Sequence, residues 1–297
     1  MQKKTYRFFW ASLSGIFLPV FLSCTTHYGN LNFKADLPFY LEENSGIISL
    51  HEGSFWLIED NGNKETLYNL DLNGDVLKSL HVKNADNADW EDLTKDTLGN
   101  IYIADFGNNG NTRKDLVIYK LPNPRHETGN QIVAKKIEFN YPEQKEFPPK
   151  DPFKFFDAEA IFHWNHALYI ITKNRSNPFT GDAFLYKIPD VPGNYKAELI
   201  AKIDICDDLG SCQITAVDIS TNGKKVIALS YGKLFIYTDF VGEDFSNGKK
   251  EIIDLGTRAQ LESLCFLNDS TLLISDERTI SGKGCNLYTF NLNLPSP

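Results

Sequence analysis

The chain has 297 residues, is 42% hydrophobic and carries a formal net charge of −9. This length suffices for one large all-β domain, or two smaller ones, with a substantial hydrophobic core. The acidic balance argues against a nucleic-acid partner, because such binding depends on basic residues that neutralise phosphates. It is compatible with the binding of cations.

Residues 1–23 have the features of an export signal. Three basic residues precede a mostly apolar run from Phe8 to Leu22, which is short and interrupted by Pro19. These features favour a cleaved signal peptide over a membrane span. The ending Phe21-Leu22-Ser23-Cys24 resembles the bacterial lipoprotein cleavage box, whose cysteine receives the lipid.

That resemblance implies a lipid anchor on Cys24, a tether over residues 24–30 and a location in the bacterial cell envelope. Thr25 and Thr26, rather than an aspartate, follow the cysteine, which by the same resemblance favours the outer membrane. We expect the periplasmic side, with surface display left open. The alternative is ordinary secretion, with Cys24 as a bystander.

From Ser45 onward, short runs rich in β-branched and aromatic residues alternate with turn signals such as Asn61-Gly62 and Asn73-Gly74. We predict five strand groups, each an antiparallel meander. The groups are 46–50, 54–58, 66–72 and 76–82; Leu93, 100–104, 116–121 and 136–141; 160–164, 167–172, 183–188 and 197–203; 216–220, 225–230, 233–237 and 250–255; and 263–267, 271–275 and 286–291.

The fifth group lacks an outer strand, whereas a spare strand at 31–35 precedes the first group. Pairing these two would close a ring, as radial β-repeats do to avoid exposed edges. Repeat periods of about 36 to 68 residues fit propeller blades with variable loops. We therefore predict one all-β domain over residues 31–297, a β-propeller of five four-stranded blades. A sixth blade within 123–153 is the alternative.

A carboxylate pattern recurs where successive groups begin: Asp89-Trp90-Glu91-Asp92, Asp157-Ala158-Glu159-Ala160 and Gln260-Leu261-Glu262-Ser263. In a meandering blade, these starts lie on one face around the central channel. We predict that Glu91, Glu159 and Glu262 surround the channel mouth, in a column that continues as Ser45 and Val217. Asp89 and Asp157 form a neighbouring column with Glu43.

The ends of the second strands supply a second polar column on the same face. Its predicted members are Asp60, Asp105, Lys173, Ser230 and Asp276, and the polar residues expected around them are Asn108, Asn109, Arg113, Arg175 and Arg278. Two polar columns that converge on one mouth are the strongest functional signal in the chain.

Three glutamates in a narrow pore repel one another, so they must protonate, bind a metal or pair with cations. Ca²⁺ suits such a site because it takes six to eight oxygen ligands. The predicted metal ligands are Glu91, Glu159, Glu262, Asp89 and Asp157. Two alternatives remain open. In the first, the acids join blades by accepting backbone N–H bonds, and Lys173 and the arginines neutralise them; in the second, they act directly in catalysis.

The pattern resembles the SdiA-regulated domain family of bacterial envelope proteins, over residues 43–110. The resemblance rests on Ser45-Gly46 opening the first group, on Asp89 and Glu91 opening the next, and on the turn Leu72-Asn73-Gly74-Asp75-Val76-Leu77 between them. It implies a five-bladed propeller with a calcium site.

The cysteines and histidines give less evidence about function than the acids do. Cys206 and Cys212 bracket a short polar loop whose ends could close into a disulfide, and the pairing of Cys265 and Cys285 is open. No Cys-x-x-Cys pair exists, which argues against a thiolate zinc site. His163-Trp164-Asn165-His166 falls in a turn predicted to lie on the face opposite the acids.

Two functions follow from this pattern. The first is a calcium-associated binding or scaffold lipoprotein, whose mouth receives a small molecule, glycan or protein. The second is a metal-dependent hydrolase of esterase, lactonase or phosphoesterase type, by fold analogy with calcium-centred propeller lactonases. An enzyme needs a general base beside the ion, a role open to Asp105 or Asp276.

Overall fold

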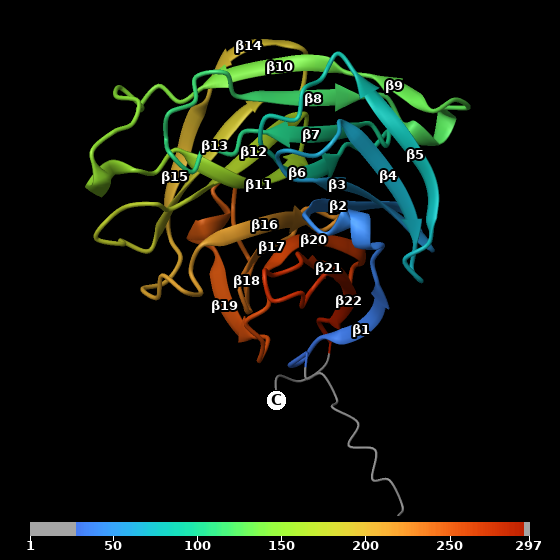
Figure 1. Cartoon of the computed structure of the whole chain (residues 1–297). Helices are drawn as coiled ribbons and strands as arrows, with labels where there is room; N and C mark the ends of the chain where they lie inside the picture. The colour runs from blue at the N-terminus through green and yellow to red at the C-terminus, as the bar shows by residue number, and fades with distance from the viewer. Residues whose placement is uncertain (1–27, 294–297) are drawn as a thin grey trace, which may run out of the picture.

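The computed structural model describes residues 28–293, and the predicted signal peptide and Cys24 lie outside this range. The described chain is all-β, with five sheets arranged in a ring (Figure 1). The predicted five-bladed β-propeller is therefore confirmed. Among the described residues, no helix is both long and apolar enough to cross a membrane.

Each blade is a meander whose first strand lies innermost. The blades comprise β2 (Asn44–His51), β3 (Ser54–Glu59), β4 (Thr66–Asp71) and β5 (Val76–Lys83); β6 (Trp90–Lys95), β7 (Ile101–Asp105), β8 (Val117–Leu121) and β10 (Lys135–Asn140); β11 (Asp157–Trp164), β12 (Ala167–Lys173), β13 (Asp182–Pro189) and β15 (Glu198–Asp204); β16 (Ile214–Ile219), β17 (Lys225–Ser230), β18 (Lys233–Thr238) and β19 (Lys249–Asp254); and β20 (Leu261–Asn268), β21 (Thr271–Asp276) and β22 (Asn286–Asn291). Within residues 28–293, four short 3₁₀ helices lie at Phe39–Leu41, Pro124–His126, Asp151–Phe153 and Phe245–Asn247.

The ring is closed by the N-terminal strand, as predicted. Strand β1 (Asn32–Asp36) pairs antiparallel with β22 and completes the fifth blade. Tyr28 stacks on Phe33 and contacts Tyr288, so aromatic packing reinforces the closure. This pairing satisfies the backbone groups that β22 would otherwise leave exposed at its outer edge.

The prediction of four strands in every blade is wrong for the first two blades, which have five. Strand β9 (Gln131–Val133) pairs parallel with β5, and β14 (Gly193–Lys196) pairs parallel with β10. Each added strand comes just before the fourth meander strand of the following blade, β9 before β10 and β14 before β15. These strands have only three and four residues, too few for a clear periodic signal. Residues 123–153 supply β9 and β10 rather than a sixth blade.

The hydrophobic core lies between neighbouring sheets. Phe162 and Tyr169 of the third blade stack, and Phe162 also meets Phe245 from the fourth. Near the channel the backbones themselves touch: a Cβ on Gly46 would lie 2.7 Å from the backbone nitrogen of Leu93. Glycine at position 46 therefore allows the innermost strands of the first two blades to pack closely.

Candidate functional site at the channel mouth

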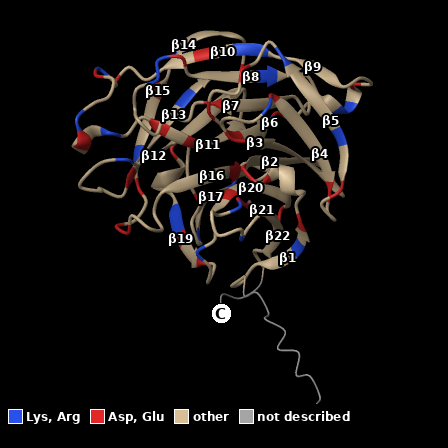
Figure 2. Cartoon of the chain, in the orientation of Figure 1, with Lys and Arg blue, Asp and Glu red and all other residues tan. Residues whose placement is uncertain are grey.

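A β-bulge interrupts the start of every innermost strand. The residues left out of the ladder are Ser45 with Gly46, Glu91, Glu159, Thr215 and Glu262. A bulge redirects the side chain of its extra residue. The three glutamates therefore occupy the same position in their blades, and their charges interact, Glu91 with Glu159 and Glu159 with Glu262. We call this end of the channel the mouth; Figure 2 shows acidic segments on the innermost strands near the centre of the ring.

The fourth blade corrects one predicted position in this column. Its bulge residue is Thr215, whereas the predicted Val217 pairs with Ala228 inside the ladder and is buried in the core. The Thr215 hydroxyl donates to the backbone oxygen of Leu261, 2.7 Å away in the next blade. Ser45 likewise donates to the backbone oxygen of Glu91. These two bulges therefore join blades and add no charge.

The predicted second polar column combines residues from two neighbouring positions of the second strands. On the second strands, the residues that pair with the position just before each bulge are Glu59, Asp105, Thr172, Ser230 and Asp276. The residues that follow are Asp60, Phe106, Lys173, Tyr231 and Glu277. Successive side chains of a strand point to opposite sides. The predicted ring mixed the two sets, and mainly the second set meets the glutamates.

Asp105 and Asp276 both belong to the first set and are held within their own blades. Asp105 lies 2.9 Å from Arg113 and accepts a bond from the backbone nitrogen of Asp89. Asp276 accepts bonds from the backbone nitrogen of Asn286, at 2.7 Å, and from the Tyr288 hydroxyl, at 2.9 Å. These two candidate general bases of the hydrolase alternative are therefore committed to structural hydrogen bonds.

Glu159 is neutralised by two cations. The ammonium of Lys173 lies 2.6 Å from one carboxylate oxygen, and Arg175 lies 3.0 Å from the other. Burial alone would lower the pKa of Lys173, but the carboxylates of Glu159 and Glu262 raise it above its ordinary value. Burial is the main cause that raises the pKa of Glu159 to about 8, and the charges of Lys173 and Arg175 oppose this shift.

Two further predicted metal ligands are also bound by protein donors. Asp157 accepts bonds from Arg175, at 2.6 Å, and from the backbone nitrogen of Asn108, at 2.7 Å. Glu262 accepts a 2.6 Å bond from the Tyr231 hydroxyl. Of the five acids predicted to bind a metal, three therefore have their charge compensated by neighbouring side chains or backbone.

The remaining two acids meet Asp60. Oxygens of Asp60, Asp89 and Glu91 lie within 4.8 Å of one another, and we call these residues the carboxylate cluster. Asp89 accepts a 2.7 Å bond from Asn61. Glu91 as a residue is only 5% exposed, and no hydrogen bond or ion pair joins its carboxylate to another residue between 28 and 293.

The carboxylate cluster is electrostatically unfavourable without a cation. Burial, followed by the charges of Glu159 and Asp60, raises the pKa of Glu91 well above its ordinary value. Burial is also the main reason why the pKa of Asp60 rises to about 7, with Asp89 adding to the shift. Repulsion among buried carboxylates is relieved by protonation or by a bound cation.

The sequence-based prediction missed Glu277, which follows Asp276 at the mouth. Burial and the charges of Glu262 and Asp60 raise the pKa of its carboxyl group to about 9. Its carboxylate accepts a 3.3 Å bond from Gln260. The signal was present in the sequence, because Glu277 occupies the same position in its blade as Asp60 and Lys173.

The other residues predicted on the binding face mainly organise loops. The Asn108 side chain accepts from the backbone nitrogens of Thr112 and Arg113, which holds the loop after β7. Asn109 accepts from Arg175. Arg278 has other partners: it lies 3.3 Å from Glu42 and over the ring of Phe39.

The histidines lie at the opposite end of the inner strands, as the position of their turn predicted. Asn165 and His166 form the connection between β11 and β12, both with positive φ. His163 lies 2.8 Å from Asp190 and stacks on Tyr102. Neither histidine therefore belongs to the mouth.

Comparison with known proteins gives no family-model match and no match among curated proteins. Solved structures do match. A streptogramin B lyase has 16% identity and a TM-score of 0.43, over 90% of this chain and 74% of that one. The PQQ-bound aldose sugar dehydrogenase of Streptomyces coelicolor has 10% identity and a TM-score of 0.52, over 88% and 97%. The chain is a β-propeller. The Dos1 propeller has 13% identity and a TM-score of 0.39, over 85% of this chain and 56% of that one. At these identities the similarity shows the fold alone.

Proposed function

We propose that this protein is a calcium-associated binding module, in which the carboxylate cluster of Asp60, Asp89 and Glu91 holds Ca²⁺ at the channel mouth. The observation that supports this most directly is the Glu91 carboxylate, which is buried, faces two other acids and lacks a protein partner among the described residues. Leaving a buried charge unpaired is costly, so a cation is its natural partner.

The donor chemistry favours Ca²⁺. Calcium takes six to eight oxygen ligands in flexible geometry, and carboxylates supply them in one- or two-oxygen modes. The three carboxylates would leave coordination positions for water or for oxygens of a ligand. Asp60 is partly exposed, so those positions would face solvent. The bound ion would then hold the mouth in shape for an oxygen-rich small molecule, a glycan or a protein.

Calcium titration of chelator-treated protein by isothermal calorimetry tests this function. Glu91→Gln keeps the size of the side chain and removes its charge, and we expect it to weaken Ca²⁺ binding by about tenfold or more, because ligand charge tunes affinity at oxygen sites. Asp60→Asn should act in the same direction. Glu52→Gln is the matched control, since Glu52 is exposed in the turn between β2 and β3, at the other end of the inner strands.

Equal calcium affinity in Glu91→Gln and the parent protein would refute the assignment of the cluster. Failure of the parent to bind Ca²⁺ at millimolar concentration would refute the metal itself. Chelator-sensitive hydrolysis of ester, lactone or phosphoester substrates, lost in Glu91→Gln, would instead support the hydrolase alternative.

We also propose that Cys24 carries a lipid that anchors the propeller to the bacterial outer membrane, on the cleavage-box pattern of residues 21–24. A single acyl chain binds membranes only weakly, so stable anchoring takes a second chain or another membrane-binding signal. Growth with a clickable fatty acid should label the parent protein but not Cys24→Ala, and only the parent should fractionate with outer membranes. Labelling of both proteins would refute this proposal.

A further inference from the structure

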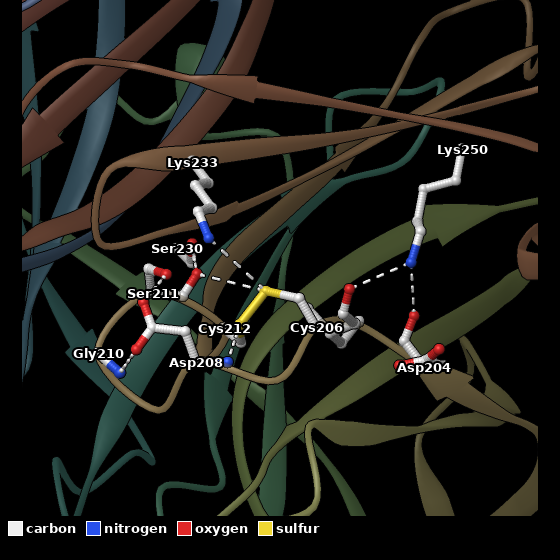
Figure 3. The surroundings of a disulfide bond; sticks show 10 residues. Asp204, Cys206, Asp208, Gly210, Ser211, Cys212, Ser230, Lys233 and Lys250 are labelled. Carbon is white, nitrogen blue, oxygen red and sulfur yellow. Dashed lines mark hydrogen bonds between the residues drawn. A yellow bond between two sulfur atoms is a disulfide. The ribbon is translucent and has the colours of Figure 1, made fainter.

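The loop between the third and fourth blades carries a disulfide, shown in Figure 3, between Cys206 and Cys212. The loop leads into β16, so it lies at the mouth end of the channel. Cys265 and Cys285, the other two cysteines among residues 28–293, are both buried and free.

The loop does not depend on the disulfide alone for its conformation. The Ser211 hydroxyl donates to the Asp208 carboxylate at 2.6 Å, and the backbone nitrogen of Gly210 donates to the same side chain at 3.1 Å. Ser230 of β17 donates to the backbone oxygen of Ser211 at 2.8 Å. The entropic stabilisation from a disulfide grows with the loop that it closes, and the separation here is only 6 residues. The folded loop can therefore persist after reduction.

Both sulfur atoms have a donor positioned to stabilise a thiolate. The Lys233 ammonium lies 3.9 Å from Sγ of Cys206, and the backbone nitrogen of Asp208 lies 3.0 Å from Sγ of Cys212. A neighbouring cation or N–H group lowers the pKa of a thiol, and a disulfide whose reduced form is stabilised is a stronger oxidant.

The two cysteines also differ in access. Cys206 is partly exposed, whereas Cys212 is only 2% exposed. An external thiolate therefore reaches Sγ of Cys206 first. Attack there makes Sγ of Cys212 the leaving group, and the N–H of Asp208 points at this atom.

We propose that Cys206–Cys212 is a thiol–disulfide exchange site that oxidises a dithiol. One thiolate of the dithiol forms a bond to Sγ of Cys206, the bond between the two protein sulfurs breaks, and its electron pair goes to Sγ of Cys212. The second thiolate of the dithiol then attacks its own sulfur in the mixed disulfide and releases Cys206 as a thiolate beside Lys233. The dithiol becomes a disulfide, and the protein gains two thiols.

We assign the stabilisation of the Cys206 thiolate to Lys233, because the other lysine near this loop does not contact sulfur. Lys250 lies in the same view, but its ammonium donates to the backbone oxygens of Asp204 and Ile205 rather than to sulfur (Figure 3). Asp208 opposes a thiolate through its negative charge, which Gly210 and Ser211 partly satisfy. The two lysines therefore form a matched pair for experiment.

The test equilibrates the folded full-length protein with graded ratios of reduced to oxidised dithiothreitol. Free thiols are then trapped by alkylation, and the Cys206 and Cys212 peptides are quantified by mass spectrometry. We expect Lys233→Met to need a dithiol ratio about tenfold higher for half-reduction, because loss of the cation destabilises the Cys206 thiolate and therefore the reduced form. Lys250→Met should leave the ratio unchanged. Asp208→Asn, which removes a negative charge, should shift it in the opposite direction.

Two results would overturn the proposal. One is an equal half-reduction ratio for Lys233→Met, Lys250→Met and the parent protein. The other is reduction that proceeds only at the rate of global unfolding and accelerates in parallel with it in urea, which would make the disulfide purely structural. Circular dichroism of the reduced protein shows whether the blades remain folded. Calcium binding enters none of these readouts, so the outcome is independent of the function proposed for the mouth.

Discussion

A Cβ on Gly107 would lie 2.0 Å from the Oε1 atom of Glu91. This Cβ would also lie 2.5 Å from the Oδ2 atom of Asp89. The loop after β7 therefore packs directly against the carboxylate cluster, and it can do so only because residue 107 has no side chain. Space, rather than an unusual backbone angle, requires glycine here.

Gly107→Ala should displace the two acids and weaken calcium binding by about tenfold or more, because ligands must be held within about 0.5 Å of their working positions. Gly110→Ala is the control in the same loop, since its nearest neighbour would be the Thr112 hydroxyl at 3.4 Å. Calcium titration of both variants measures the effect. Equal affinities would show that Gly107 does not shape the site.

Lys173→Met should destabilise the fold by about 3–5 kcal/mol, because it leaves the buried Glu159 carboxylate without its closest cation. Urea denaturation measures the free energy of unfolding. The double variant Lys173→Met with Glu159→Gln should recover much of that loss, since both charges are gone. Lys202→Met, which removes an exposed lysine paired with Asp182 at 2.9 Å, should cost less than about 1 kcal/mol. A comparable cost in the two single variants would contradict this account.

Glu277 should make the calcium-free protein less stable as the pH rises. Its pKa is about 9 in the folded protein and 4.5 as the reference for the unfolded chain. Between these values the unfolded state gives up the proton while the folded state retains it, so folding stability falls through this window as the pH rises. Glu277→Gln lacks this titration.

The difference in Tm between Glu277→Gln and the parent protein should therefore be smallest near pH 5 and grow toward pH 9. Differential scanning calorimetry in the presence of a chelator provides the measurement. Glu52→Gln is the control because Glu52 is exposed, and its Tm difference should stay constant. A difference for Glu277→Gln that is equally constant would show that the carboxyl group titrates normally in the folded protein.

The fold and the shared position of the three bulge glutamates could be predicted from the amino-acid sequence. Each blade is a local meander, so alternating apolar runs and turn residues predicted it without any long-range information. The bulge recurs at the same place in the repeat, which is why Glu91, Glu159 and Glu262 could be assigned to one mouth before the structure. The closing role of residues 31–35 followed from counting strands.

Which acids remain without partners could be seen only once the blades were placed side by side. Lys173 and Arg175 neutralise Glu159, whereas Tyr231 from the fourth blade binds Glu262 of the fifth. These pairings depend on side-chain directions across blades, and a shift of one residue along a strand reverses such a direction. That is why Asp105 and Asp276 were expected at the mouth but lie within their blades, and why Asp60 joins Glu91. A repeat in the sequence predicts the position of a residue within its blade. Whether the charge of that residue is compensated depends on side chains of other blades, which the repeat does not predict.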